Sequence, residues 1–150
     1  DPAVGIDNWR KAFAQAADSG GFPLPILIEN TAGGTKAIAR HLDRIAQLWD
    51  AIGDYGPGFC LDTCHAHAGG EDLDGIVDRV TAITGRIDLV HANGSRDAFD
   101  SGADRHTNFG TGLIAPEVIA EIVKSAASDV IVETPAEGQA SDITYLRQNS

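Results

Sequence analysis

The stretch Phe59-Cys60-Leu61-Asp62 is a short, continuously apolar run that ends on a residue able to bind a metal ion. Continuous apolar runs of this length are typical of strands that are buried on both faces of a parallel sheet. Each such run in this chain is followed by a stretch with helical composition, so the pattern predicts an α/β fold of repeated strand–helix units. Three other runs share the design: Ile26-Leu27-Ile28-Glu29, Leu89-Val90-His91 and Val130-Ile131-Val132-Glu133.

Helices and strands are expected to alternate along the whole chain. The strands are predicted up to Glu29 and over residues 58–62, 87–92 and 129–133. Residues 63–70 and the polar stretch 93–113 are predicted to be loops, and a loop as long as the second is usually functional. Asp7 is the expected N-cap of the first helix. Apolar residues at helical spacing predict the helices 7–19, 35–52, 71–84, 116–127 and 140–148.

Length and composition are those of one globular domain. The chain has 150 residues, of which 43% are hydrophobic, so a packed core is expected. A closed eight-stranded barrel takes about 250 residues, whereas this chain holds four strand–helix units. We therefore expect an α/β fold of the TIM-barrel type, (β/α)n, in which residues 1–150 form a single partial domain equivalent to half of a (β/α)8 barrel.

Charge and apolar patterning restrict the partners. The net charge of −11 argues by itself against nucleic acid, although bound divalent cations would offset part of that charge. No apolar run reaches the roughly 18 residues that a membrane span needs, and the first residues do not resemble an export signal. We therefore expect a cytoplasmic protein without membrane contact, in which Cys60 and Cys64 stay reduced.

The ends of the four predicted strands carry potential metal ligands. In a parallel α/β fold the carboxyl ends of the strands meet on one face, which would bring Glu29, Asp62, His91 and Glu133 together. Three carboxylates and an imidazole at one spot repel one another unless a cation neutralises them. The sequence therefore predicts a metal site, in place of the helix caps and loop salt bridges that isolated strand-end carboxylates usually form.

A second group of potential ligands lies in the predicted loops. His65, Asp104 and His106 would form a two-histidine, one-carboxylate site of the kind that zinc accepts. Two metal ions about 4 Å apart are the usual apparatus for hydrolysing phosphodiesters. Arg105, flanked by two candidate ligands, is expected to contact an anionic substrate. Asn93 is expected to touch substrate or to hold its loop, and His41 and His67 are expected to be solvated and not to bind metal.

Several motifs occur together in one order and spacing. They are Ile28-Glu29-Asn30-Thr31-Ala32-Gly33, Gly58-Phe59-Cys60-Leu61-Asp62-Thr63-Cys64-His65-Ala66, His91-x-Asn93, Asp104-Arg105-His106 and Val132-Glu133-Thr134. With these motifs, the chain from about residue 22 onward resembles the endonuclease IV family of apurinic/apyrimidinic endonucleases, which are zinc-dependent DNA repair enzymes. The Leu-Asp-Thr-Cys-His-Ala and Asp-Arg-His elements are the most specific part of the resemblance.

The resemblance implies a fold and an activity. The family is a (β/α)8 barrel with three zinc ions that cuts the phosphodiester 5′ to abasic sites in DNA during base excision repair. The chain would correspond to the C-terminal portion of that barrel and would hold complete ligand sets for two of the three ions. The N-terminal strands would then be absent, so self-association or a missing N-terminal half is expected to complete the barrel.

The resemblance also assigns roles to individual residues. One zinc would be held by His65, Asp104 and His106, and Glu29 would bridge the second zinc to the third. Glu29 and Glu133 are the expected catalytic residues, and Arg105 and Asn93 the expected substrate-binding ones. The full set of expected zinc ligands is Glu29, Asp62, His65, His91, Asp104, His106 and Glu133.

Two alternatives remain open from the sequence. Sugar isomerases and epimerases on a related barrel also place Glu, Asp and His at strand ends, but they bind one or two Mn²⁺ or Mg²⁺ ions. The separate histidine-rich group around His65 favours the nuclease. The second alternative is an inactive fragment that binds metal without catalysing a reaction.

Overall fold

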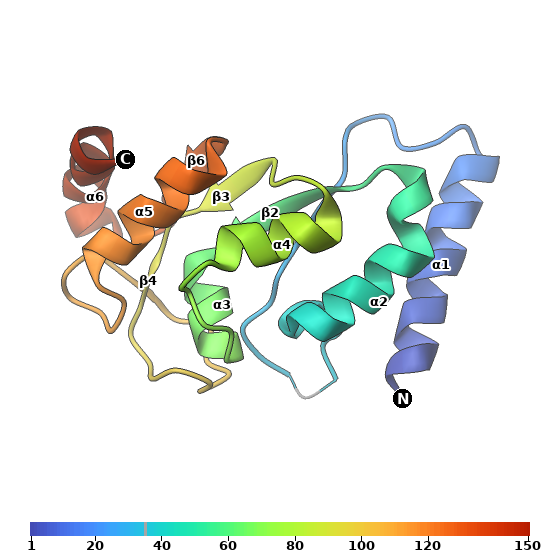
Figure 1. Cartoon of the computed structure of the whole chain (residues 1–150), viewed down its shortest axis with the longest axis horizontal. Helices are drawn as coiled ribbons and strands as arrows, with labels where there is room; N and C mark the ends of the chain where they lie inside the picture. Colours follow the sequence, from blue (N-terminus) through green and yellow to red (C-terminus); the bar gives the residue numbers. More distant parts are fainter. Residues whose placement is uncertain (35) are drawn as a thin grey trace.

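A computed structural model describes residues 1–34 and 36–150 of the chain. Its helices and strands follow the alternation expected for strand–helix units (Figure 1). The regular elements, including two short 3₁₀ helices (η), are α1 Pro2–Asp18, β1 Leu27–Glu29, η1 Ile38–Arg40, α2 Leu42–Ile52, η2 Gly53–Tyr55, β2 Gly58–Asp62, α3 Thr63–Gly69, α4 Ile76–Thr84, β3 Leu89–His91, β4 Gly94–Ser95, β5 His106–Thr107, α5 Pro116–Ala126, β6 Asp129–Ile131 and α6 Ala136–Asn149.

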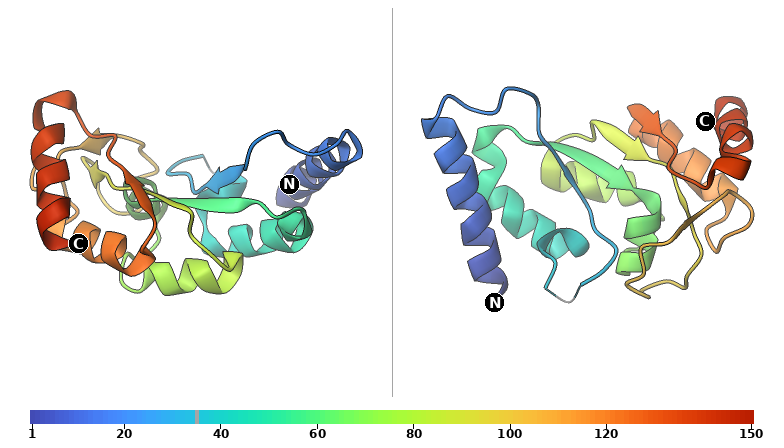
Figure 2. Two further views of the ribbon diagram at one scale, coloured as in Figure 1. Left: turned by 90° about the horizontal axis from the view of Figure 1, so that it is seen from above. Right: turned by 180° about the vertical axis from the view of Figure 1, so that it is seen from behind.

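The main sheet has four parallel strands in the order β1-β2-β3-β6, which is the order of the chain. Helices α2, α4 and α5 lie on one side of this sheet (Figure 2). The predicted α/β fold of the partial-barrel type is confirmed. The two edge strands expose apolar side chains, because Leu27 on β1 is 36% exposed and Ile131 on β6 is 46% exposed.

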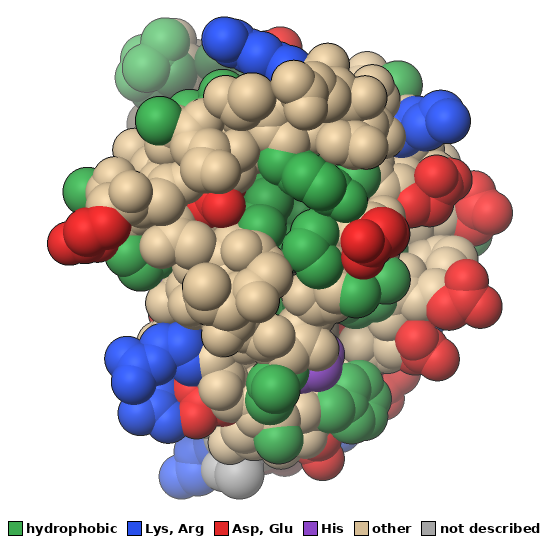
Figure 3. All heavy atoms as spheres, turned by 90° about the vertical axis from the view of Figure 1, so that its left-hand side faces the viewer, with side chains coloured by type: hydrophobic (Ala, Val, Ile, Leu, Met, Phe, Trp, Pro, Cys, Tyr) green, Lys and Arg blue, Asp and Glu red, His purple; other side chains and the backbone are tan. Residues whose placement is uncertain are grey.

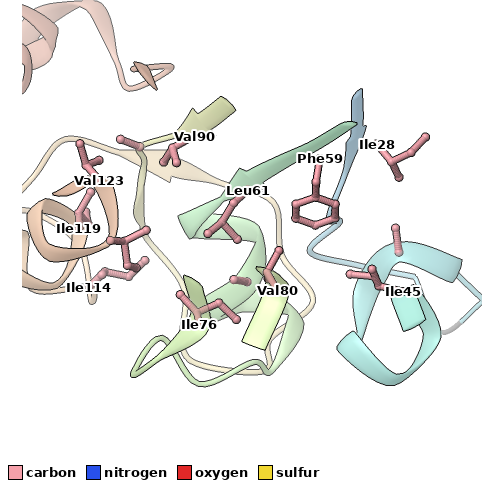
Figure 4. Close-up of a cluster of buried hydrophobic side chains, with 14 of the residues drawn as sticks. Ile28, Ile45, Phe59, Leu61, Ile76, Val80, Val90, Ile114, Ile119 and Val123 are labelled. Carbon is pink, nitrogen blue, oxygen red and sulfur yellow. The ribbon is translucent and has the colours of Figure 1, made fainter. Parts of the chain in front are cut away.

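Alternation along the strands separates a helix-facing set of side chains from a set on the opposite face. Phe59 and Leu61 of β2 are almost completely buried and point toward the helix layer, as does Val90 of β3 (Figure 4). Because successive side chains of a strand point to opposite faces, the neighbouring Cys60 and Asp62 point away from the helices. The apolar packing under the helices therefore decides which face receives the predicted ligands.

The core between sheet and helices consists of aliphatic and aromatic side chains, among them Phe59, Leu61, Ile45 and Val80. Phe59 meets the ring of Trp49 edge-on at 5.7 Å between ring centroids, and Val80 and Ile45 are each 1% exposed. Such burial contributes on the order of 1.5–3 kcal/mol per large side chain before entropy is subtracted. This core fixes β2, on which the arrangement of the site depends.

Several predicted boundaries were wrong, each for a local reason. The loop predicted over 63–70 is helix α3, because the Asp62 carboxylate accepts a hydrogen bond from the His65 amide at 2.7 Å and caps it. The helix predicted over 35–52 begins at Leu42, whose amide donates to Glu71 at 3.0 Å; its first predicted residue lies outside the described residues. The helix predicted over 71–84 begins at Ile76, after Gly75 in a left-handed conformation.

Other differences concern the two ends of the chain and the long polar stretch. The first helix begins at Pro2 with Asp1 as its N-cap, and Asp7 instead pairs with neighbouring basic side chains. The last helix begins at Ala136, earlier than expected. The loop predicted over 93–113 contains the small antiparallel pair β4–β5, in which Ser95 lies opposite His106. This pair anchors the segment that carries Asp104 and His106.

Candidate metal centre

The ends of three parallel strands bring their predicted ligands together. In the β2–β3 register Asp62 lies opposite His91, and Glu29 ends the neighbouring strand β1 opposite Cys60. All of these side chains lie on the face of the sheet away from the helices. Glu133 reaches the same face two residues beyond Ile131 of β6, which pairs with His91. The convergence that the sequence predicts is therefore present in the structure.

The four side chains at the strand ends form what we term the carboxylate cluster, which consists of Glu29, Asp62, His91 and Glu133. Its polar centre is the Nδ1 atom of His91, which lies 3.2 Å from a Glu133 carboxylate oxygen, 3.3 Å from Glu29 and 4.0 Å from Asp62. Asp62 is fully buried, whereas the side chains of Glu29 and Glu133 are 35% and 41% exposed. The cluster thus has a closed base and an open rim that solvent or a substrate can reach.

A second group, which we term the histidine cluster, adjoins the first. The Asp104 carboxylate lies 3.1 Å from Nε2 of His65 and 3.3 Å from Nε2 of His106. The two imidazole rings are 5.4 Å apart between centroids. One Asp62 oxygen lies 3.6 Å from Nε2 of His106, and Glu29 lies 3.1 Å from Nδ1 of His65. Asp62 and Glu29 therefore connect the two clusters.

Backbone carbonyls fix which nitrogen of each imidazole faces the histidine cluster. Nδ1 of His65 lies 2.9 Å from the carbonyl oxygen of Asn30, and Nδ1 of His106 lies 3.4 Å from that of Glu133. A carbonyl can only accept, so each Nδ1 donates and each neutral ring keeps its lone pair on Nε2. Histidines that bind metals are commonly held in this way by a hydrogen bond from the other nitrogen.

The histidine cluster fits a metal ion better than it fits a hydrogen-bonded network. Nε2 of His65 and Nε2 of His106 are both buried and have no hydrogen-bond partner with adequate geometry, although Asp104 is close. Ligands about 2.0–2.2 Å from a tetrahedral ion stand about 3.3–3.6 Å apart. The separations of 3.1 and 3.3 Å around Asp104 are close to this spacing. Two imidazole nitrogens and a carboxylate oxygen held at this spacing leave a position between them that a metal ion can occupy.

The electrostatics of the site also favour a bound cation. Burial raises the pKa of the Asp62 carboxyl, although His65 and His106 nearby act against this. A hydrogen bond from His65 lowers the pKa of Glu29. Within the described part of the chain, no Lys or Arg forms an ion pair with the carboxylates of either cluster, which pair with histidines alone. A divalent cation would supply the missing positive charge.

Two cysteines lie close enough to be considered as ligands. Cys60 groups with Glu29 and His91, and Cys64 groups with Asp62 and His106. Burial raises the pKa of the Cys60 thiol to about 12 and that of Cys64 to about 11. The metal-binding form of cysteine is the thiolate, so in the metal-free chain both cysteines are held in the form that does not bind metal. Both cysteines are free, as expected from the sequence.

Asn93 lies behind the ligands in a fully buried position. Its side-chain amide donates to Asp62 at 2.7 Å and to Glu133 at 3.3 Å, and its carbonyl oxygen accepts from the Glu133 backbone at 2.8 Å. Asn30 plays a similar part, since its side chain exchanges two hydrogen bonds with the Asp62 backbone at 2.8 and 2.9 Å. The position of Asn93 is that of a residue that orients two ligands.

The remaining predicted residues lie at the margin of the site. Arg105 forms an ion pair with Asp97 and is 55% exposed, so its guanidinium stands at the surface beside the histidine cluster. His67 is not solvated as expected: its Nε2 atom is buried without a hydrogen-bond partner, and its ring meets that of Phe99. His41 is 46% exposed and lies near Glu71, outside both clusters.

Sequence reasoning missed a residue that secures the loop carrying Asp104. Arg40 donates to the carbonyl of Gly69 at 3.1 Å and to the carboxylate of Asp100 at 2.7 Å, and only 13% of its side chain is exposed. It thereby ties the end of α3 to the long loop. The backbone of Gly33, in the segment after β1, approaches that of Gly102 in the same loop and leaves no space for a side chain at Gly33.

Comparison with known proteins concerns the fold and the family of the chain. Residues 3–149 match the family model described as a xylose isomerase-like TIM barrel. The probable endonuclease 4 of Mycobacterium ulcerans is 55% identical over 144 residues, which are 96% of this chain and 56% of that protein. The probable endonuclease 4 of Mycobacterium leprae is 53% identical over 146 residues, again covering 56% of its length. The chain thus spans just over half the length of these relatives.

Solved structures also resemble the chain in fold. Endonuclease IV from Thermus thermophilus superposes with a TM-score of 0.77 at 28% identity, covering 99% of this chain and 57% of that one. A D-tagatose 3-epimerase-like protein superposes with a TM-score of 0.73 at 19% identity over 96% of this chain and 54% of its own, a likeness of fold alone.

Fold and site together define an α/β barrel protein of the xylose isomerase-like class, with imidazoles and carboxylates gathered at the strand ends. Within this class, the chain belongs to the endonuclease IV family. Among the described residues, no helix is long and apolar enough to cross a membrane.

Replacing Asn93 with alanine should lower stability substantially. The Asn93→Ala variant leaves the buried Asp62 carboxylate and the Glu133 amide each short of a partner. We expect the free energy of unfolding to fall by about 2–3 kcal/mol. Urea unfolding of the metal-free protein measures this, with the exposed Asn8→Ala as the matched control. A loss as small as that of the control would contradict the role assigned to Asn93.

The metal-free protein should lose stability as the pH rises from about 6.5 to about 9. Burial alone lowers the pKa of His65, but the hydrogen bond to Glu29 and the charges of Asp62 and Asp104 outweigh it and raise the pKa to about 9. The folded-state pKa exceeds the unfolded value, so the contribution of His65 is complete below about 6.5 and is lost as the pH passes 9.

Urea unfolding with a chelator present, at several pH values, tests this expectation. His65→Gln should remove most of the decline between these pH values, whereas His41→Gln, outside both clusters, should leave it in place. An unchanged decline in His65→Gln would show that other groups cause it.

Proposed function

We propose that this chain carries the zinc-binding part of an apurinic/apyrimidinic endonuclease, which hydrolyses the DNA phosphodiester 5′ to an abasic site in base excision repair. The observation that carries the proposal is the pairing of two clusters, one rich in histidine and one rich in carboxylate, joined by Asp62 and Glu29. Adjacent metal sites suit phosphodiester hydrolysis. The likeness to proteins named probable endonuclease 4 supports the same reaction.

Zinc is the proposed metal because the histidine cluster offers two imidazoles and one carboxylate. This mixture of nitrogen and oxygen ligands suits zinc better than it suits magnesium or calcium, which take oxygen ligands. His65, Asp104 and His106 would hold one ion, and Glu29, Asp62, His91 and Glu133 would hold a second. When bound, zinc supplies Lewis acidity toward the phosphate and lowers the pKa of a coordinated water.

The rim of the carboxylate cluster is the proposed location of the chemistry. Glu29 and Glu133 are the more exposed of its carboxylates, so each can present an oxygen to a water molecule beside the phosphate and accept a proton from it. Asn93 holds Glu133 and Asp62 in place from behind. Asp62 contributes fixed negative charge at the closed base of the site.

Arg105 is the proposed phosphate contact. Arg105 is the next residue after the proposed ligand Asp104, and its guanidinium is exposed. A DNA phosphate can therefore replace Asp97 as its ion-pair partner or share the guanidinium with it. Arg96, whose backbone pairs with that of Arg105, adds positive charge in the same loop. These cations, together with the bound metal ions, would counter the net charge of −11 where DNA approaches.

The open sheet edges suggest how the barrel is completed. Among the described strands, β1 and β6 each pair on one side only, and both expose apolar side chains. We propose that a further segment, N-terminal in the family barrel, or a second copy of this chain covers these edges. In the family that segment also brings the remaining ligands of a third zinc ion.

Nicking of DNA that contains a single abasic site tests the proposed function. Protein purified without added metal should hold about two zinc ions by mass spectrometry and should cut 5′ to the lesion, leaving a 3′-hydroxyl that a polymerase extends. Glu133→Gln should lower the rate at least about 100-fold, because a carboxylate of the reacting rim is lost. Glu137→Gln, an exposed acid on α6, is the matched control and should change it less than about twofold.

Two outcomes would contradict this function. Zinc at about two equivalents without nicking would identify an inactive metal-binding chain. One Mn²⁺ or Mg²⁺ ion with turnover of a ketose would identify a sugar isomerase or epimerase instead.

A further inference from the structure

The surface of the helix layer contains a groove that the proposed nuclease site does not use. It lies between α4 and α5, with a volume of about 630 Å³, within the range of cavities that bind ligands. Its walls include Ile76 and Val77 from α4 and Val118 and Ile122 from α5. The groove opens on the helix side of the sheet, whereas both metal clusters lie on the opposite side.

Apolar side chains of this groove are exposed to an unusual degree. Leu113 is 61% exposed, Phe99 53% and Val118 37%, and all three line the groove. Single exposed apolar residues are common on protein surfaces, but several around one concavity mark an interaction site. Figure 3, in which the front of the Figure 1 view lies to the right, shows acidic side chains gathered along that right-hand side of the molecule.

The rim of the groove carries charge of one sign. No Lys or Arg is among the groove-lining residues that the structure describes. Nucleic acid would be repelled by such a rim, and a second copy of this chain, with its net charge of −11, is also disfavoured. A partner with basic residues beside an apolar face can pair its charges with the acidic rim and pack its apolar side chains into the groove. The acidic residues of the rim, all exposed, are Asp72, Asp74, Asp78, Glu117 and Glu121.

We propose that the groove between α4 and α5 is a docking site for a basic amphipathic helix of a partner protein. An apolar face of such a helix would lie on Leu113, Val118 and Phe99, as in other helix-in-groove complexes, while its Lys and Arg residues face the acidic rim. The partner would also contact the loop that carries Asp104, because Phe99 and Leu113 belong to the same segment. The inference does not depend on the proposed nuclease activity.

Binding of a model peptide tests the proposal. The probe is a fluorescent 18-residue peptide of Leu, Ala and Lys with Leu on one helical face, measured by anisotropy at physiological salt with the 150-residue chain. A peptide of the same composition in scrambled order is the first control. We expect the amphipathic peptide to bind at least about tenfold more tightly than the scrambled one.

Matched charge reversals distinguish the effect of the acidic rim from the effect of the total charge of the chain. Asp74→Lys/Glu121→Lys changes both sides of the rim and should weaken binding at least about tenfold. Asp18→Lys/Asp50→Lys makes the same charge change at exposed sites on α1 and α2, and should weaken it less than about twofold. Leu113→Gln/Val118→Gln should also weaken binding about tenfold, whereas Val4→Gln, an equally exposed apolar residue on α1, should have little effect.

Three results would overturn the proposal. Equal effects of the two charge-reversed pairs would show that net charge alone attracts the peptide. Equal binding of the scrambled peptide would show that the groove does not recognise an amphipathic face. A dimer in sedimentation experiments that Leu113→Gln/Val118→Gln abolishes would show that a second copy covers the groove.

Discussion

The arrangement of the site depends on a single buried carboxylate, that of Asp62. Its side chain is completely buried, and among the described residues its charge is balanced only by hydrogen bonds and histidines. One oxygen caps α3 through the His65 amide at 2.7 Å, and the other accepts from Asn93 at 2.7 Å and faces His106 and His91. The same group therefore starts a helix, directs His65 into the histidine cluster and connects the two clusters.

The sequence was sufficient to predict the sheet, because its strands are buried on the helix side. Phe59, Leu61 and Val90 are apolar for that reason, and alternation along the strand then determines where Asp62 and His91 point. The strand β2 was predicted with its observed bounds. The grouping of His65 with Asp104 and His106 was also predicted, since these residues lie in the segments that follow two successive strands and form a ligand set that zinc accepts.

What the sequence could not provide depends on contacts between distant segments. Helix α3 was predicted as a loop because its short, Gly-flanked sequence has weak helical periodicity, and the cap that starts it comes from the last residue of a strand. Arg40 has no signal in the sequence, because its importance arises from reaching Gly69 and Asp100 across the fold. The burial of Asn93 likewise follows from the strands on both sides of it. Local patterns predict elements and ligands, but not the bonds that orient them.

The two faces of the sheet therefore have different chemistry. On one face, imidazoles and carboxylates gather that lack a Lys or Arg partner among the described residues. The other face is covered by the helix layer, whose outer surface carries an apolar groove bordered by acidic residues. Helix α3 contributes to both, through His65 on one side and His67 on the other. The long loop does the same through Asp104 and Phe99. A molecule bound in the groove would thus rest on the elements that position the ligands.

X-ray absorption spectroscopy of the zinc-loaded chain would show whether carboxylates and imidazoles, and not the buried thiols, hold the metal. Cys60 and Cys64 lie within the same groups of side chains, so the alternative is sterically open. We expect only nitrogen and oxygen ligands, at about 2.0–2.2 Å, with imidazole scattering beyond them. A zinc–sulfur distance of about 2.3 Å would contradict this expectation.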